Sequence, residues 1–257
     1  MPYLSIAATN LYYEQHGSGP DLVLLHGVGG NHASWFEQLA GLSDHFRITT
    51  FDARGFGNSN DLEQLGRSGF VGDLEMLWNH LEIESAVLLG QSMGGGCALS
   101  FACRHPDRVR SLIMADTLVG IDLPHAAQKL MSEAELSTVN LAQVERVLGR
   151  TTRQKQPEKV ILYTQIASFN TVNLRTLKGV QSKASLADID AIGIPVLFVV
   201  GSEDVLFPPD AIRLVQQQLT HSHFIEITGA GHSAHFEAPD KFNRIILEWV
   251  RSIEAAS

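Results

Sequence analysis

A serine between glycines is the most reactive-looking group in the chain. The segment GQSMGG, residues 90–95, places Ser92 two positions from Gly90 and from Gly94. It follows the apolar run at 86–89, which predicts a buried strand, and it precedes small residues that predict a helix. Glycines on either side of such a turn remove Cβ atoms that would collide with neighbouring elements. We therefore expect a strained turn that presents the Ser92 hydroxyl as a nucleophile; an ordinary glycine-rich turn is the alternative.

A serine hydroxyl is a weak nucleophile at neutral pH, so it needs a base and an acid behind that base. His232, in GAGHSAHFEAP, follows the last predicted strand, and Asp204, in VVGSEDVLFPP, follows the strand before it. Loops after adjacent parallel strands meet at one edge of a sheet, so we expect both side chains to lie near Ser92. His235 is the alternative base. Asp116, which ends another predicted strand, is the alternative acid.

Acyl transfer also needs donors for the negative charge that develops on the substrate oxygen. The backbone N–H of Met93 is expected at a helix N-terminus, where the helix dipole favours an anion. The segment LLHGVGGNHASW follows the first predicted parallel strand, and its glycines, Gly27 among them, allow close approach of the backbone to a ligand. We expect the N–H of Val28 to face that of Met93. His26 is expected to bond the loop backbone.

This chemistry requires neither a metal nor an organic cofactor. The pair His221 and His223 has metal-ligand types, but no third ligand stands out, so we interpret the pair as part of a solvated loop. Cys97 and Cys103 fall in one predicted helix, about 9 Å apart along its axis, so a bridge between them is not expected. Two unpaired thiols suit a reducing compartment.

Short apolar runs alternate with helical patterns along most of the chain, which is typical of a doubly wound α/β sheet. Residues 70–81 place their large apolar side chains on one helical face, and residues 242–253 follow the i, i+3, i+4, i+7 spacing. Runs near 4–6 and 11–13 predict an antiparallel hairpin at the sheet edge, which makes an eight-stranded, mostly parallel sheet. The predicted parallel strands are 22–25, 48–51, 86–89, 112–115, 196–200 and 224–227.

The alternation breaks between residues 118 and 187, where helical patterns occur without a clear strand. We interpret this segment as a helical cap over the carboxyl end of the sheet, inserted into a core formed by residues 1–117 and 188–257. It holds nine Lys/Arg and five Asp/Glu, a balance of +4, so the remainder of the chain, at −9 overall, carries −13. Helix-like pieces cover 126–131, 141–148 and 157–168.

Composition excludes several classes of function. With 257 residues, 44% hydrophobic and 18% charged, the chain is long enough for one large folded domain and is not typical of disordered proteins. A net charge of −9 argues against general binding to nucleic acid or to an anionic membrane surface. No stretch approaches the roughly 20 apolar residues that span a bilayer. The first residues lack the charged and apolar regions of a signal peptide, so a cytoplasmic protein is expected.

Together, these segments resemble the α/β-hydrolase family. HGVGG resembles its oxyanion loop, GQSMGG its nucleophile elbow, GSED its acid loop and GHSAHFEAP its histidine loop. FDARGFGNS, residues 51–59, resembles the signature that follows the next strand. The resemblance runs from about Leu4 to Ile253 in the family's order, interrupted only by the predicted cap.

The resemblance implies the α/β-hydrolase fold and a catalytic triad of Ser92, His232 and Asp204. It also implies that Asp52 and Arg54 are structural. Within the family, the chain is similar to small esterases, enol-lactone hydrolases, cofactor-free perhydrolases and carbon–carbon bond hydrolases of aromatic ring-cleavage products. We expect a carboxylic ester hydrolase for small acyl esters or lactones.

Alternative functions differ in their chemistry. A carbon–carbon bond hydrolase of aromatic meta-cleavage products or a 3-oxoadipate enol-lactonase is one alternative, although Gln91 and Ser233 replace the Asn and Trp that carbon–carbon hydrolases usually show. Peroxide interception of the acyl-enzyme is another. A small-molecule receptor with slow turnover is a non-enzymatic alternative. A nucleophile that is Ser rather than Asp or Cys argues against haloalkane dehalogenase and dienelactone hydrolase chemistry.

A substrate pocket is expected between the sheet and the cap. The basic cap leads to the hypothesis that Arg175 or Lys178 binds a carboxylate of a keto acid or lactone substrate; a solvated charged face is the alternative. Partners beyond a small molecule are not expected, and either a monomer or a homodimer fits the sequence. The predicted pocket residues are Gly27, Trp35, Leu118, Phe169, Arg175 and Leu206.

Overall fold

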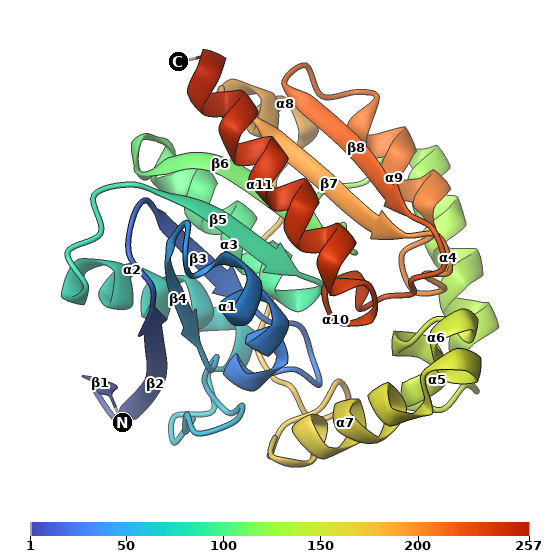
Figure 1. Cartoon of the computed structure of the whole chain (residues 1–257), viewed down its shortest axis with the longest axis horizontal. Helices are drawn as coiled ribbons and strands as arrows, with labels where there is room; N and C mark the ends of the chain where they lie inside the picture. Colours follow the sequence, from blue (N-terminus) through green and yellow to red (C-terminus); the bar gives the residue numbers. More distant parts are fainter. Residues whose placement is uncertain (1, 257) are drawn as a thin grey trace.

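The computed structural model, which describes residues 2–256, contains one eight-stranded sheet with helices on both faces (Figure 1). The strand order is β1-β2-β4-β3-β5-β6-β7-β8. β1 pairs antiparallel with β2, and β2 with β4, whereas the other neighbours are parallel. The predicted eight-stranded, mostly parallel sheet is therefore confirmed. The strands are β1 (Tyr3–Ile6), β2 (Thr9–His16), β3 (Asp21–Leu25), β4 (Arg47–Phe51), β5 (Ala86–Gln91), β6 (Val109–Ala115), β7 (Val196–Gly201) and β8 (Ser222–Ile227).

The central strands are buried on both faces because helices cover each side, and this is why their sequences are continuous apolar runs. Along β5, Val87 and Leu89 pack with α1 (Phe36–Leu42) and α11 (Pro239–Ala256) in one core cluster. Leu88 faces the opposite cluster, which includes side chains of α2, α3 and α9. The alternation of side chains along a strand thus builds two cores from one run. The helices of the second cluster are α2 (Phe70–His80), α3 (Met93–Arg104) and α9 (Pro209–Gln216).

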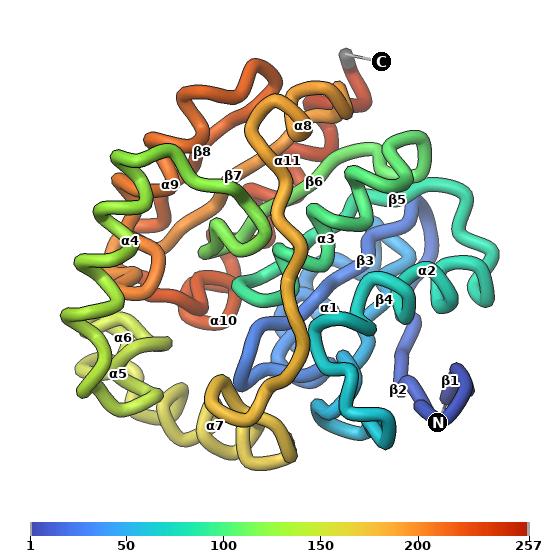
Figure 2. Tube along the Cα trace, turned by 180° about the vertical axis from the view of Figure 1, so that it is seen from behind, coloured from blue at the N-terminus to red at the C-terminus, as the bar shows by residue number. Residues whose placement is uncertain are grey.

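The segment between β6 and β7 is mainly helical, and within residues 118–187 the only β pairing described is an isolated bridge between Ile121 and Ala184. Figure 1 shows α5 to α7 beyond the arrowheads of β5 and β7, at the carboxyl end of the sheet. After α7 the chain returns across the molecule as an extended strap to α8 (Figure 2). None of the described helices is long and apolar enough to cross a membrane. The remaining helices are α4 (His125–Thr138), α5 (Gln143–Val147), α6 (Arg150–Lys155), α7 (Pro157–Ser168), α8 (Leu186–Ala191) and α10 (Ala234–Glu237), with short 3-10 turns η1 (His32–Trp35), η2 (Gly66–Ser68) and η3 (Pro106–Arg108).

Candidate active site

The turn between β5 and α3 holds Ser92 in a strained conformation, with φ 51° and ψ −117°. Its backbone N–H donates to the carbonyl of Ala115 at 3.0 Å, which ties the turn to the neighbouring strand. A Cβ on Gly90 would lie 2.5 Å from the carbonyl oxygen of Gly94. Only glycine therefore allows β5 and α3 to approach this closely, and the close approach fixes the serine at the apex.

Ser92, His232 and Asp204 form one chain of hydrogen bonds. The Ser92 Oγ lies 2.9 Å from His232 Nε2, and His232 Nδ1 lies 2.9 Å from Asp204 Oδ2. The second carboxylate oxygen of Asp204 accepts from the backbone N–H groups of Leu206 and Phe207, at 2.8 and 3.0 Å. The structure thus brings together the three residues that the sequence singled out, in the geometry of a nucleophile, a base and an orienting acid. Their catalytic roles stay a prediction.

Asp116, the alternative acid, lies in the same buried region but bonds to different groups. Its Oδ1 accepts from Gly201 N at 2.8 Å and its Oδ2 from Ala234 N at 3.1 Å. Among the described residues no hydrogen bond joins it to His232. Burial and the nearby charge of Asp204 raise the pKa of Asp116 well above its usual value. The geometry of Asp116 therefore fits a structural role, in which it joins two loops by hydrogen bonds, better than it fits the role of orienting the imidazole.

The loop before the first helix comes very close to the serine turn. A Cβ on Gly27 would lie 2.1 Å from Gln91 Oε1 and 2.9 Å from Ser92 Cβ, so this approach requires glycine. His26 Nδ1 lies 2.8 Å from the carbonyl oxygen of Gly27, and its Nε2 accepts from Ala53 N at 3.0 Å. Burial lowers the pKa of His26, so the ring is neutral and serves both bonds. This arrangement agrees with the expected role of His26 in holding the loop backbone.

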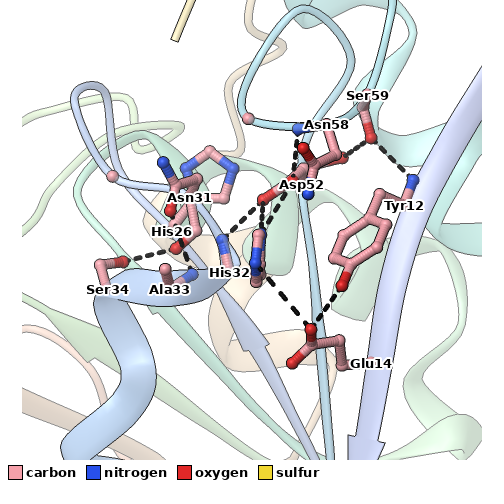
Figure 3. Close-up of polar contacts among 12 residues, drawn as sticks. Tyr12, Glu14, His26, Asn31, His32, Ala33, Ser34, Asp52, Asn58 and Ser59 are labelled. Atoms are coloured by element: carbon pink, nitrogen blue, oxygen red, sulfur yellow. Dashed lines mark hydrogen bonds and ion pairs between the residues drawn. The ribbon is translucent and has the colours of Figure 1, made fainter. Parts of the chain in front are cut away.

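A second network holds the same loop from the other side, as Figure 3 shows. Asp52 Oδ1 accepts from the backbone N–H and from Nδ1 of His32, at 2.6 and 2.8 Å, and its Oδ2 accepts from Asn58 N at 2.8 Å. Glu14 lies 3.9 Å from His32 Nε2 and accepts a hydrogen bond from Tyr12. Asp52 is fully buried and bonds within the protein, as expected for a structural residue. The loop that carries Val28 is therefore preorganised.

A pocket opens beside the imidazole of His232. One wall comes from the glycine loop and from the segment after His232, and the other comes from α5 and α7 of the segment at 118–187. Its lining contains no Asp, Glu, Lys or Arg among the described residues. The lining residues are Val28, Gly29, Gly30, Ser34, Gln91, Val147, Tyr163, Ile166, His232, Ser233, His235 and Phe236.

Most side chains that we predicted to line a pocket lie outside this cavity, so that part of the prediction is corrected. Trp35 is fully buried and packs on His235 with ring centroids 4.4 Å apart, and Leu118 is a buried member of the opposite core. Phe169, at the end of α7, is 68% exposed, and Arg175 is exposed on the strap. Leu206 packs beside the apolar pocket wall without lining the cavity. Neither the hydrophobicity nor the charge of a residue reveals the direction of its side chain in a loop.

Comparisons with known proteins agree with this fold. Residues 20–184 match the family described as alpha/beta hydrolase fold. The chain belongs to the α/β-hydrolase family. It is 28% identical to a protein of Mycobacterium tuberculosis named as a non-heme bromoperoxidase, with 96% of this chain and 99% of the relative covered. It is 27% identical to a pimeloyl-[acyl-carrier protein] methyl ester esterase of Yersinia enterocolitica, with 94% and 97% covered. A solved thermophilic esterase from Thermogutta terrifontis superposes with a TM-score of 0.80 at 27% identity, covering 98% of this chain and 99% of the other.

Glu237 is a functional candidate that the sequence analysis missed in this α/β hydrolase. Its buried carboxylate accepts from Gly231 N at 2.9 Å and Ser233 N at 3.2 Å, the residues on either side of His232. The other oxygen accepts from Gly149 N at 2.8 Å, at the start of α6. One carboxylate therefore holds the histidine loop and joins it to the segment above the pocket. The signal was its place within GHSAHFEAP, the segment assigned to the histidine loop.

We expect Glu237→Gln to lower kcat by about 10- to 100-fold, because a small misplacement of a catalytic group is costly. The amide nitrogen cannot accept, so at least one loop N–H loses its partner. The negative charge of Glu237 also contributes to raising the pKa of His232, so the acid limb of the pH–rate profile should move to lower pH. Steady-state rates across pH test both effects, with the exposed Glu248→Gln on α11 as the control. A fall in Tm with normal kcat and an unmoved profile would assign Glu237 to stability alone.

The surroundings of His232 predict the pH dependence of a reaction in which this ring is the general base. Burial opposes protonation of the ring, but the charge and hydrogen bond of Asp204 outweigh it and raise the pKa of His232. A general base must be neutral, so the ring is inactive until the pH exceeds this raised value. We expect the acid limb of kcat/KM to have its midpoint above about 6.5, the usual histidine pKa. A midpoint below that value, measured with an ester whose own ionisation is constant, would contradict this account.

Proposed function

We propose that this protein is a serine hydrolase that cleaves small uncharged carboxylic esters or lactones through an acyl-enzyme. The observation that carries the proposal is the continuous hydrogen-bonded chain from Asp204 through His232 to Ser92 beside a pocket. The esterase names of two similar proteins, each 27% identical to this chain, support the same reaction class.

In the proposed reaction, His232 Nε2 removes the proton from Ser92 Oγ as that oxygen attacks the ester carbonyl. Asp204 holds the ring through Nδ1 and stabilises the imidazolium that forms. The imidazolium then protonates the leaving alkoxide, which leaves the acyl group on Ser92. Water, deprotonated by the same nitrogen, attacks the acyl-enzyme and releases the acid.

The oxyanion of the tetrahedral intermediate requires two fixed donors in this proposal. Met93 begins α3, so its N–H lies at the positive end of the helix dipole. Val28 follows Gly27, whose backbone approaches Ser92 closely, and its own side chain lines the pocket. We assign the N–H groups of Met93 and Val28 to this role. Loss of one such donor typically lowers kcat by about 10²–10³-fold.

The pocket favours a small uncharged substrate. No Lys or Arg side chain lines the described cavity, and Arg175, the predicted carboxylate partner, is exposed on the strap. A buried carboxylate without a partner is costly, so an anionic acyl group is disfavoured there. The apolar wall from Val147, Tyr163 and Ile166 suits a short aliphatic group. We propose that the segment at 118–187 acts as the cap that closes this pocket.

Hydrolysis of p-nitrophenyl acetate through octanoate by the wild type and by Ser92→Ala tests the proposal. We expect turnover above about 1 s⁻¹ on the best ester, with an optimum at a short chain and dependence on Ser92. A succinyl monoester of the same length should be cleaved more slowly than its uncharged counterpart. Equal rates for the two proteins on every ester would overturn the proposed function.

Perhydrolysis is a second candidate, favoured by the similarity to a protein named as a bromoperoxidase. Hydrogen peroxide would replace water in the attack on the same acyl-enzyme, and a peracid would be released in place of the acid. Peracid formation is measured by bromination of monochlorodimedone with acetate, peroxide and bromide. Bromination absent in Ser92→Ala but present in the wild type supports this candidate.

A further inference from the structure

His235 is a polar side chain in the pocket wall that the proposed mechanism does not use. Its ring lines the cavity and is 4% exposed, packed on Trp35 and near Phe242, with ring centroids 4.4 and 6.0 Å away. Within residues 2–256, neither ring nitrogen takes part in a hydrogen bond, and Nδ1 is buried without any partner. Its backbone carbonyl accepts from Gln38, which fixes the segment but leaves the ring unpaired.

An unpaired buried nitrogen is unusual, because most buried polar groups are hydrogen-bonded. Burial, together with the nearby His232, lowers the pKa of His235 to about 3, so the ring is neutral at physiological pH. A neutral imidazole has one donor and one acceptor nitrogen. The aromatic neighbours hold the ring in place without satisfying either one.

Three other polar side chains of the pocket already have partners within the protein. Ser34 Oγ donates to the carbonyl of Asn31 at 2.6 Å, and Gln91 Nε2 donates to the carbonyl of His232 at 2.7 Å. Tyr163 Oη accepts from Gln143 Nε2 at 3.0 Å. The ring of His235 is thus fixed by its packing and makes no hydrogen bond to the described residues. A bound ligand could supply the missing partner.

We propose that His235 determines specificity by hydrogen bonding to an uncharged oxygen substituent, a hydroxyl or a ketone, in the acyl or alcohol portion of the substrate. The identification of the substrate as an ester rests on the proposed function. The hydrogen bond to the oxygen substituent can be measured without turnover. Because the ring is neutral and no Lys or Arg among the described residues lines the cavity, we infer that the substituent is not a carboxylate. A deoxy analogue leaves the imidazole unpaired and binds more weakly.

Isothermal titration calorimetry of Ser92→Ala tests the proposal without catalysis. The probes are methyl 3-hydroxybutyrate, methyl acetoacetate and 2-hydroxyethyl butyrate, each against its apolar counterpart, methyl butyrate or propyl butyrate. We expect at least one oxygenated ester to bind about 10- to 100-fold more tightly than its counterpart. The preference should disappear in Ser92→Ala/His235→Phe and survive in Ser92→Ala/His45→Phe, which alters an exposed histidine.

Equal affinities for all pairs in Ser92→Ala overturn the inference, and so does a preference that survives His235→Phe. If the phenylalanine variant does not fold, Ser92→Ala/His235→Leu serves instead, because leucine also removes both ring nitrogens and should abolish the preference. Turnover of methyl butyrate by the wild type is measured separately. Absence of turnover with a clear binding preference would reject the proposed function and leave the inference intact.

Discussion

Replacement of Ser92 by alanine is expected to lower kcat on p-nitrophenyl butyrate by about 10⁴- to 10⁶-fold, the range typical of removal of a triad nucleophile. The hydroxyl oxygen lies 2.9 Å from His232 Nε2 and is the atom that attacks the carbonyl in this account. Without it no acyl-enzyme forms, and only binding and oxyanion stabilisation remain.

The same substitution should leave the fold intact. Alanine meets the same backbone strain at φ 51° as serine does, and among the described residues the serine side chain has a hydrogen bond only to His232. Activity assays and circular dichroism on Ser92→Ala are compared with those on Ser100→Ala, which alters a serine of α3, the helix that follows Ser92. Retention of more than a few per cent of activity by Ser92→Ala, once contamination by wild type is excluded, would reassign the nucleophile.

Asp204→Asn is expected to lower kcat by about 10⁴-fold, because an amide favours the wrong tautomer of the base and no longer stabilises the imidazolium. The carboxylate accepts from His232 Nδ1 at 2.9 Å and is fixed by two backbone N–H groups of its own loop. KM should change far less than kcat, since Asp204 does not line the pocket.

Asp116→Asn provides the matched comparison. It removes a second buried carboxylate near the same imidazole but interrupts only a tie to Gly201 or Ala234. We expect kcat to fall less than about 10-fold, together with a loss of stability of about 1–3 kcal/mol from the unpaired donor. The reverse order of effects on kcat would place the catalytic acid at the end of β6.

The sheet was predictable because its strands are continuous apolar runs and its helices have clear periods. The run at 86–89 lies within β5 and is buried at every position, and the amphipathic face at 242–253 packs on one side of the sheet within α11. The glycine turns were also predictable from the sequence, because residues such as Gly90 lie where a Cβ would collide with the backbone. Local sequence determines these features, so a single chain is enough to predict them.

The pocket was not predictable in the same way. The direction of a side chain in a loop depends on what packs against it, so Trp35 turned into the core while Phe169 turned to solvent. Glu237 and His235 share the segment that contains His232, yet only their contacts with distant elements give them a place in the site. Such contacts between segments far apart in the sequence have no local pattern.

The most direct test of the central claim is intact-mass spectrometry of the protein quenched in acid shortly after mixing with p-nitrophenyl acetate, followed by peptide mapping. We predict a gain of one acetyl group, located on Ser92, which decays as the substrate is exhausted and is absent in Ser92→Ala. His232→Ala should show little or no adduct, since the base is missing. Rapid ester cleavage without an acetylated intermediate, or with acetylation at another residue, would contradict the assignment of Ser92 as the nucleophile.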